Sequence, residues 1–280
     1  MKNSLKAFQL LPALIISAGL LSNVAQAHFQ LLYTPESALN EAQAIDIALV
    51  FSHPFHNGYP MSMGTPQEFY VIQDRGEGIP TKTTDLREYL KPVTWKNSDQ
   101  ASADAFVANL PKSVTRSIGD YSFVLVPEPY YEAAEDKYIQ QYTRAMINVG
   151  GAPGSWDAPI GLPVEIIPLD KPYANWVGGV FRAVVVSNGE PVPNAEIEIE
   201  YLNHDPLIDQ AIFDPIGKIE APQGSFTTMS VRANDRGEIT IGLPKEGWWG
   251  ICALDLDNAE TFNDKDLSVD AVLWVRAYAP

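Results

Sequence analysis

The chain is poor in cysteine, histidine and basic residues. It has 1 cysteine and 4 histidines, and 19 lysines and arginines stand against 35 aspartates and glutamates. The single cysteine, Cys252, excludes an internal disulfide, and its apolar neighbours predict a small buried side chain. The formal charge of −16 argues against nucleic acid as a partner and favours small cations or basic protein surfaces.

The motifs of hydrolytic and phosphoryl-transfer enzymes are also missing from the sequence. It contains no Gly-x-Ser-x-Gly segment, no Walker loop and no paired cysteine and histidine. Beyond the first 27 residues, no apolar run approaches the ~20 residues that a membrane span needs. The sequence therefore predicts a binding protein rather than an enzyme, with no membrane span in the exported chain.

The N-terminus has the pattern of a cleavable signal peptide. Lys2 and Lys6 precede an apolar run over residues 10–21, and Ala25-Gln26-Ala27 supplies the small-x-small pattern that a signal peptidase reads. We therefore expect export to the periplasm and loss of the first 27 residues, so that the mature chain begins at His28. That segment contains two lysines and no acid, which leaves 17 basic against 35 acidic side chains and a formal charge of −18.

A histidine at a mature N-terminus can bind a metal ion with two of its own groups. The free α-amine titrates near ~8 and, unlike an amide, can close a chelate ring with the imidazole of the same residue. His53 and His56 follow in a loop where Pro54 forbids a regular helix, so a turn would bring the two imidazoles together. Amine and imidazole nitrogens suit nickel, cobalt, copper or zinc, and methionine sulfur would add a soft ligand. The candidate metal ligands are His28, His53, His56, Met61 and Met63.

Plainer interpretations of these residues stay open. Methionines most often fill a core, although Met61 and Met63, two residues apart on an extended chain, would face the same way. A lone loop histidine is most often a solvated polar residue, which is the interpretation we give to His204. For His56 the sequence leaves a ligand role and a solvated role equally open.

The rest of the chain is typical of short strands separated by turns. Its strand segments are rich in β-branched and aromatic residues, and Gly, Pro or Asn bounds them. The predicted strands are 44–51, 68–73, 121–126, 144–149, 164–167, 177–186, 195–201, 226–233, 238–243, 248–254 and 271–278. One short helix is predicted over about Glu132–Gln141, because good helix formers follow a proline-rich segment there.

The proline-punctuated stretch Pro168–Pro172 is the predicted domain boundary. We expect a mainly β fold of two tandem β-sandwich domains, an Ig-like domain over 28–170 and a second domain over 171–280. All the candidate metal ligands lie in the first domain. In the second, the spacing from Val192–Glu200 to Asp235–Ile241 resembles that of transthyretin-like or carboxypeptidase-regulatory-like sandwiches. The adjacent Trp248 and Trp249 should point to opposite faces of a strand, so at least one is predicted to lie in a core.

Six segments of the chain carry a family resemblance: His28-Phe29, Phe51-Ser-His-Pro-Phe55, Asp120–Phe123, Pro129–Tyr138, Gly161–Leu169 and Gly247-Trp-Trp-Gly250. Together they resemble the DUF4198 family, and the resemblance runs through essentially the whole mature chain. More narrowly, the chain is similar to periplasmic nickel- and cobalt-uptake members. The resemblance implies metal delivery to an inner-membrane nickel or cobalt importer, with His28 and His53 as the main ligands. Relatives commonly have an acidic residue after His-Pro-Phe, where this chain has His56.

Two other classes of function remain open from the sequence. A terminal histidine with a second histidine is also the core of copper histidine-brace oxygenases, and Tyr59, Trp95 and Trp156 could supply the flat aromatic face that those enzymes present to a polymer. The chain could instead be a metal-independent scaffold. Nickel or cobalt bound without redox turnover favours transport, copper with peroxide-dependent oxidation favours the oxygenase, and no metal binding favours the scaffold.

Overall fold

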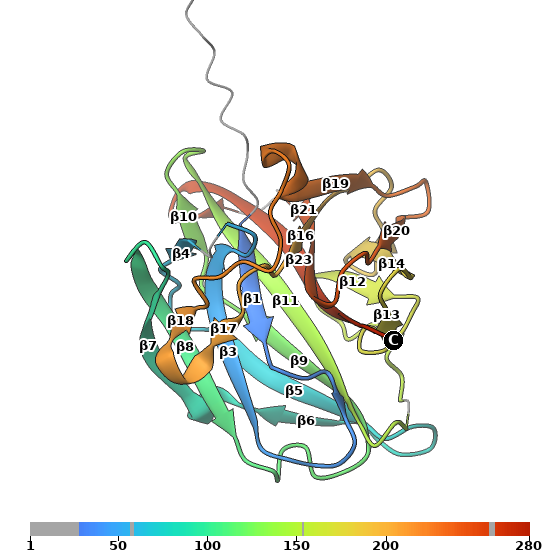
Figure 1. Ribbon diagram of the computed structural model, residues 1–280. Coiled ribbons are helices and arrows are strands. Elements are labelled where there is room, and N and C mark those ends of the chain that lie inside the picture. Colours follow the sequence, from blue (N-terminus) through green and yellow to red (C-terminus); the bar gives the residue numbers. More distant parts are fainter. Residues whose placement is uncertain (1–27, 57–58, 153, 258–260) are drawn as a thin grey trace, which may run out of the picture.

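The computed structural model describes residues 28–56, 59–152, 154–257 and 261–280, so the predicted signal peptide lies outside it. Strands in three sheets make up nearly all regular structure of this part, which confirms the predicted mainly β class (Figure 1). The helical segments are three short 3-10 turns: Arg87–Tyr89, Ile208–Gln210 and Gly224–Phe226. Within the described segments, no helix has the length and apolar character that a membrane crossing requires.

The first sheet has seven strands and carries the N-terminal end of the described chain. Its order is β1-β3-β8-β7-β18-β17, and β4 pairs with β3. The bounds are β1 Phe29–Tyr33, β3 Ile45–His53, β4 Tyr59–Met61, β7 Leu90–Lys96, β8 Ser102–Leu110, β17 Pro206–Leu207 and β18 Ile212–Phe213.

The second sheet has twelve strands and runs through both predicted domains. Its main order is β19-β16-β21-β23-β11-β9-β5-β6, and four short strands pair at its margins. The main strands are β5 Glu68–Asp74, β6 Lys82–Asp85, β9 Gly119–Val126, β11 Lys137–Val149, β16 Glu196–Tyr201, β19 Thr228–Arg232, β21 Gly247–Asp257 and β23 Lys265–Tyr278. The short ones are β2 Ala38–Leu39 and β10 Tyr130–Glu132 on β11, and β13 Asn175–Trp176 and β22 Thr261–Phe262 on β23.

The third sheet has four strands from the second half of the chain. They are β12 Val164–Pro168, β14 Val180–Ser187, β15 Glu190–Pro191 and β20 Glu238–Gly242. Figure 1 shows this sheet and the first sheet on opposite sides of β21 and β23, which lie between them. The arrangement is therefore layered, with the large sheet shared by two sandwiches.

Strands β21 and β23 contribute to two hydrophobic cores because successive side chains point to opposite faces. Trp248 and Cys252 of β21 belong to the first core, together with β1, β3 and β9 residues. Trp249 and Ile251 of the same strand belong to the second core, with β12, β14 and β20. The expectation for the paired tryptophans is confirmed for both, since each lies in a core, and Cys252 is fully buried as predicted.

The predicted division into domains 28–170 and 171–280 stays a prediction. Strands from the two sides of this boundary share a sheet, because β11 pairs in parallel with β23 from Tyr138 opposite Leu267 to Ala145 opposite Trp274. Trp248 and Trp274, from the second half of the chain, also lie in the first core. The two cores are thus joined by hydrogen-bonded strands, not by a linker alone.

The helix predicted over Glu132–Gln141 is wrong. Tyr130–Glu132 forms β10, the next four residues form a turn that ends at Asp136 with φ 55°, and Lys137 begins the long strand β11. Strand β11 gains backbone partners from β10, β9 and β23. This pairing outweighs the helix propensity of two alanines and a glutamate, which is worth only a few tenths of a kcal/mol per residue.

Candidate metal site at the N-terminal strand

The register between β1 and β3 brings His28 next to His53. Phe29 lies opposite Ser52 in this antiparallel pair, so one step outward along both strands places His28 opposite His53. Side chains at directly opposed positions have Cβ atoms ~4.5–5.5 Å apart. The ring centroids of His28 and His53 are 4.6 Å apart, with 40° between the ring planes. We call the pair of His28 and His53 the histidine corner.

Buried side chains from the second sheet hold the backbone on which His28 stands. The Gln141 side-chain amide donates to the His28 carbonyl at 2.7 Å, and the Gln30 backbone N–H donates to Gln141 Oε1 at 2.7 Å. The Trp274 indole N–H donates to the Gln30 carbonyl at 2.9 Å. These contacts fix the backbone at the start of β1, from which the side chain of His28 extends.

The loop after His53 is held by the second half of the chain. The Phe55 backbone N–H donates to Glu200 Oε2 at 3.2 Å, and the Asn203 backbone N–H donates to the Pro54 carbonyl at 3.1 Å. The Phe55 side chain lies in the second core. The residues that position His53 therefore come from both halves, although His28 and His53 lie in the first.

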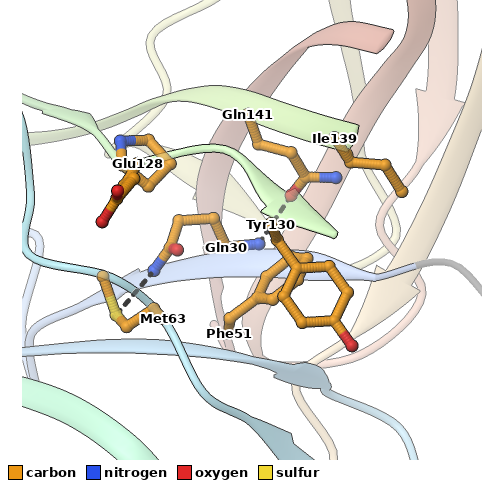
Figure 2. Close-up of a pocket in the computed structure, with 8 residues that line it drawn as sticks. Gln30, Phe51, Met63, Glu128, Tyr130, Ile139 and Gln141 are labelled. Atoms are coloured by element: carbon orange, nitrogen blue, oxygen red, sulfur yellow. Dashed lines mark hydrogen bonds between the residues drawn. The ribbon is translucent and has the colours of Figure 1, made fainter. Parts of the chain in front are cut away.

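Aromatic rings form one wall of the histidine corner. The His28 ring lies 5.7 Å from the Phe51 ring and 6.2 Å from the Tyr130 ring, and the last two are 5.0 Å apart. Figure 2 shows Phe51 and Tyr130 side by side at a small cavity of about 10 Å³, room for about one water. The same view shows Gln30 contacting Met63 and Gln141.

A carboxylate from the β10–β11 hairpin reaches the imidazole of His28. The distance from His28 Nε2 to Glu132 Oε2 is 3.4 Å, and the two side chains are 20% and 13% exposed. Burial lowers the pKa of His28, while the charges of Glu132 and Glu135 act in the opposite direction. The net shift favours neutral imidazole, which is the form that binds metals.

An acidic cavity of about 90 Å³ adjoins His28. Its carboxylates are those of Glu135, Glu198, Asp255 and Asp270. Burial raises the pKa of Glu198 to about 7 and that of Asp270 to about 6. Lys137 lies in the same cavity, with its Nζ 2.8 Å from Glu135 and 3.6 Å from Asp255. These raised pKa values leave Glu198, and to a smaller extent Asp270, partly protonated near neutral pH, and Lys137 adds a positive charge. The cavity beside His28 is therefore less negative than its four carboxyl groups alone would make it.

Of the remaining candidate ligands, one is exposed and two lie inside the first core. His56 is exposed, and its ring lies 5.9 Å from the Phe55 ring. Met61 and Met63 are both buried in the first core, the common position of methionine side chains, and their role as ligands stays a prediction. Met63 Sδ lies 3.7 Å from Gln30 Nε2.

His204 is not the solvated residue that the sequence suggested. It is 8% exposed, and its Nδ1 lies 2.7 Å from the Asp214 carbonyl oxygen, to which it donates. Trp95, one of the three aromatics considered for an oxygenase surface, is fully buried in the first core, whereas Trp156 is partly exposed. The side chain of Tyr59 lies outside the described part of the chain.

Among the described residues, no group of three or more histidine, cysteine, aspartate or glutamate side chains is arranged to hold a metal ion. The predicted ligand set has a different composition, since its third nitrogen is the α-amine that export would free at His28. In the uncleaved chain this nitrogen is an amide and is a poor ligand. Sequence reasoning missed Glu132 and Gln141, because it took their segment as a helix. The available signal of a strand was the presence of strand-favouring side chains after the turn, namely Tyr138, Ile139, Tyr142 and Thr143.

These sheets define a layered β-sandwich protein, with the histidine corner at the start of its first strand. The chain matches the family described as "Domain of unknown function (DUF4198)" over residues 25–257, and it belongs to that family. No curated protein matches it.

Solved structures resemble the chain only distantly. The Yersinia pseudotuberculosis adhesin InvE has 11% identity and a TM-score of 0.23, over 87% of this chain and 58% of the adhesin. The D0-D1 domain of intimin has 8% identity and a TM-score of 0.20, over 90% of this chain and 100% of that domain. The red sea bream transglutaminase has 10% identity and a TM-score of 0.21, over 89% of this chain and 31% of the enzyme. The chain thus spans little more than half the length of the adhesin, and similarities at this level carry no argument about function.

Proposed function

We propose that the exported chain binds one divalent transition-metal ion, nickel or cobalt, at the histidine corner and delivers it to an inner-membrane importer. The observation that carries this proposal is the 4.6 Å separation of the His28 and His53 rings at the start of the predicted mature chain. The ligands are the α-amine and imidazole of His28 and the imidazole of His53. Nitrogen ligands of this borderline kind suit nickel and cobalt.

Delivery needs a site that releases its ion as well as binding it. Three nitrogen ligands leave coordination positions open, where a partner protein can attack the metal–ligand bonds, whereas a closed four-ligand site is typical of structural metals. The His28 side chain keeps 20% exposure, which gives a partner access. The acidic cavity beside it, and a net charge of −16 for the whole chain, attract cations from solution.

The proposal is tested by metal titration of two matched proteins. One begins at His28, and the other carries a single alanine before His28 and is otherwise identical. We expect nickel or cobalt to bind the first with one ion per chain, and the second far more weakly, because the alanine turns the amine of His28 into an amide. Equal binding by both proteins would remove the amine from the site.

The same proteins separate the rival functions. Preferential copper binding, together with peroxide-dependent oxidation by the copper-loaded protein, would overturn delivery in favour of an oxygenase. Failure to bind any of these metals would favour the scaffold. In cells, deletion of the gene should lower nickel or cobalt content when the metal is scarce, and the defect should vanish when it is plentiful.

A further inference from the structure

We propose that Glu132 is a positioning residue for His28. Its carboxylate accepts the Nε2–H of the His28 imidazole and so leaves Nδ1 free to bind the metal together with the α-amine. This inference rests on the proposed function and deepens it. The carboxylate contributes no metal–ligand bond. It selects which ring nitrogen carries the proton, and it limits rotation of the ring.

The chelate fixes which nitrogen has to be free. The α-amine and Nδ1 are joined through Cα, Cβ and Cγ, so a metal held by both closes a six-membered ring. Nε2 lies on the far side of the imidazole and cannot reach an ion held by the amine. A neutral imidazole carries one N–H and one lone pair, so binding requires the tautomer with the proton on Nε2. Metal-binding histidines commonly donate their other N–H to a carboxylate, which fixes this choice.

The contacts of Glu132 orient its carboxylate for this role. Its Oε1 accepts the Ala134 backbone N–H at 2.9 Å, which leaves Oε2 directed at His28 Nε2, 3.4 Å away. The residue ends β10, where it pairs with Lys137 of β11, so the ladder fixes its backbone. A separation of 3.4 Å exceeds a normal N–H···O hydrogen bond of ~2.7–3.2 Å. We expect this distance to shorten when the ring turns Nδ1 toward the metal, so that the hydrogen bond forms in the metal-bound protein.

Glu135 provides a matched comparison three residues along the same hairpin. Its charge also acts to raise the pKa of His28, and it lines the neighbouring cavity. Its carboxylate, however, lies 2.8 Å from Lys137 Nζ, and its side chain is 50% exposed. Glu135 therefore contributes charge near the site without a contact to the imidazole, which is the property that separates it from Glu132.

The test compares Glu132→Gln with Glu135→Gln in the protein that begins at His28. Each removes one negative charge with almost no change of shape, so the difference between them reports the directed contact. Because Oε1 of Glu132 faces the Ala134 N–H, the amide oxygen of the Glu132→Gln variant takes that place and the new NH₂ group faces His28 Nε2. A donor in this position favours the wrong tautomer, with the proton on Nδ1.

Two measurements are made on each variant. The ¹⁵N shifts of the His28 ring, without metal and at a pH where it is neutral, should report the Nε2–H tautomer in the parent and in Glu135→Gln, and a shift toward Nδ1–H in Glu132→Gln. Nickel affinity should fall ~10-fold in Glu132→Gln. It should fall less than ~3-fold in Glu135→Gln, whose ion pair is exposed.

The outcomes distinguish this inference from the proposed function. An unchanged tautomer in Glu132→Gln, or an equal loss of nickel affinity in both variants, would overturn the role of Glu132 while leaving metal binding intact. If the parent protein binds neither nickel nor cobalt, the proposed function fails, whereas the tautomer measurement still decides whether Glu132 orients the ring.

Discussion

His53 and His204 are equally buried, at 8% exposure each, yet their surroundings differ in kind. His204 donates from Nδ1 to the Asp214 carbonyl at 2.7 Å, a contact that fixes a loop. His53 instead lies beside a second imidazole, and a carboxylate reaches that imidazole from a separate hairpin. Burial alone therefore does not identify a candidate ligand, whereas the groups next to the imidazole ring do.

The largest effect should come from blocking the amine. One added residue before His28 should weaken nickel binding at least ~100-fold, at or beyond the upper end of the losses seen for residues outside the ligand set. Isothermal titration measures it, and a thermal melt without metal is the control, because the extension should leave the fold unchanged. A chain that keeps full affinity with the extra residue would show that the amine is no ligand.

The direct comparison comes next. His53→Ala should reduce nickel affinity at least ~10-fold. His204→Ala should leave nickel affinity unchanged and lower the free energy of unfolding by ~1–3 kcal/mol, because the Asp214 carbonyl loses its donor. Both quantities follow from nickel titration and urea denaturation of the two variants. Loss of nickel affinity in His204→Ala, with unchanged affinity in His53→Ala, would contradict the assignment of His53 as a metal ligand.

Sequence reasoning predicted much of the fold because local patterns decide strands. The segment Ala195–Tyr201 alternates acidic and apolar residues, and its isoleucines Ile197 and Ile199 lie in the second core as the pattern requires. The same alternation puts Glu200 on the polar face of the strand. The side chain is nevertheless buried, and the Phe55 backbone N–H and the Thr228 hydroxyl donate hydrogen bonds to it. Contacts of this kind join residues far apart in the chain, and periodicity does not report them.

The candidate site could be predicted only in part, because it too depends on contacts between residues far apart in the chain. The predicted cleavage after Ala27 and the Ser-His-Pro-Phe loop indicate His28 and His53 as candidate ligands from the sequence. Their juxtaposition depends on the register that puts Phe29 opposite Ser52, and no local pattern fixes that register. The contact of Glu132 with His28 could not be predicted because the segment around Glu132 contains helix-forming residues. It forms a hairpin because β10 pairs with β11, which in turn pairs with β23.

A third prediction concerns pH and the buried carboxylate that holds the loop after His53. Burial raises the pKa of Glu200 to about 7 from the usual 4.5, although hydrogen bonds from Thr228 and the Phe55 N–H act against the shift. Between these values the folded chain keeps a proton that the unfolded chain has lost. The free energy of unfolding should therefore fall as pH rises from about 5 to 7, by at most ~1.4 kcal/mol per pH unit from this group.

Urea denaturation at several pH values checks the slope. Glu200→Gln cannot ionise, so the fall in stability between about pH 5 and 7 should be shallower in this variant than in the parent. Burial also raises the pKa of Asp270, to about 6, so some slope should remain. A parent protein whose stability rises across this range would contradict the assignment.

The smallest effect is expected at His56. Its side chain is exposed, and its ring lies 5.9 Å from the Phe55 ring. His56→Ala should change nickel affinity by less than ~2-fold, which is the scale of surface substitutions. A loss comparable with that of His53→Ala would add His56 to the ligand set and would mean that the loop rearranges around the ion.

The most direct test of the central claim is a native mass measurement of the protein recovered from the periplasm. One spectrum reports both the N-terminus and the bound metal. The account predicts a chain that begins at His28 and carries one nickel or cobalt ion, which is lost on mild acidification as the imidazoles protonate. A chain that begins at any other residue, or one that begins at His28 and holds no metal after growth in nickel and cobalt, would contradict it.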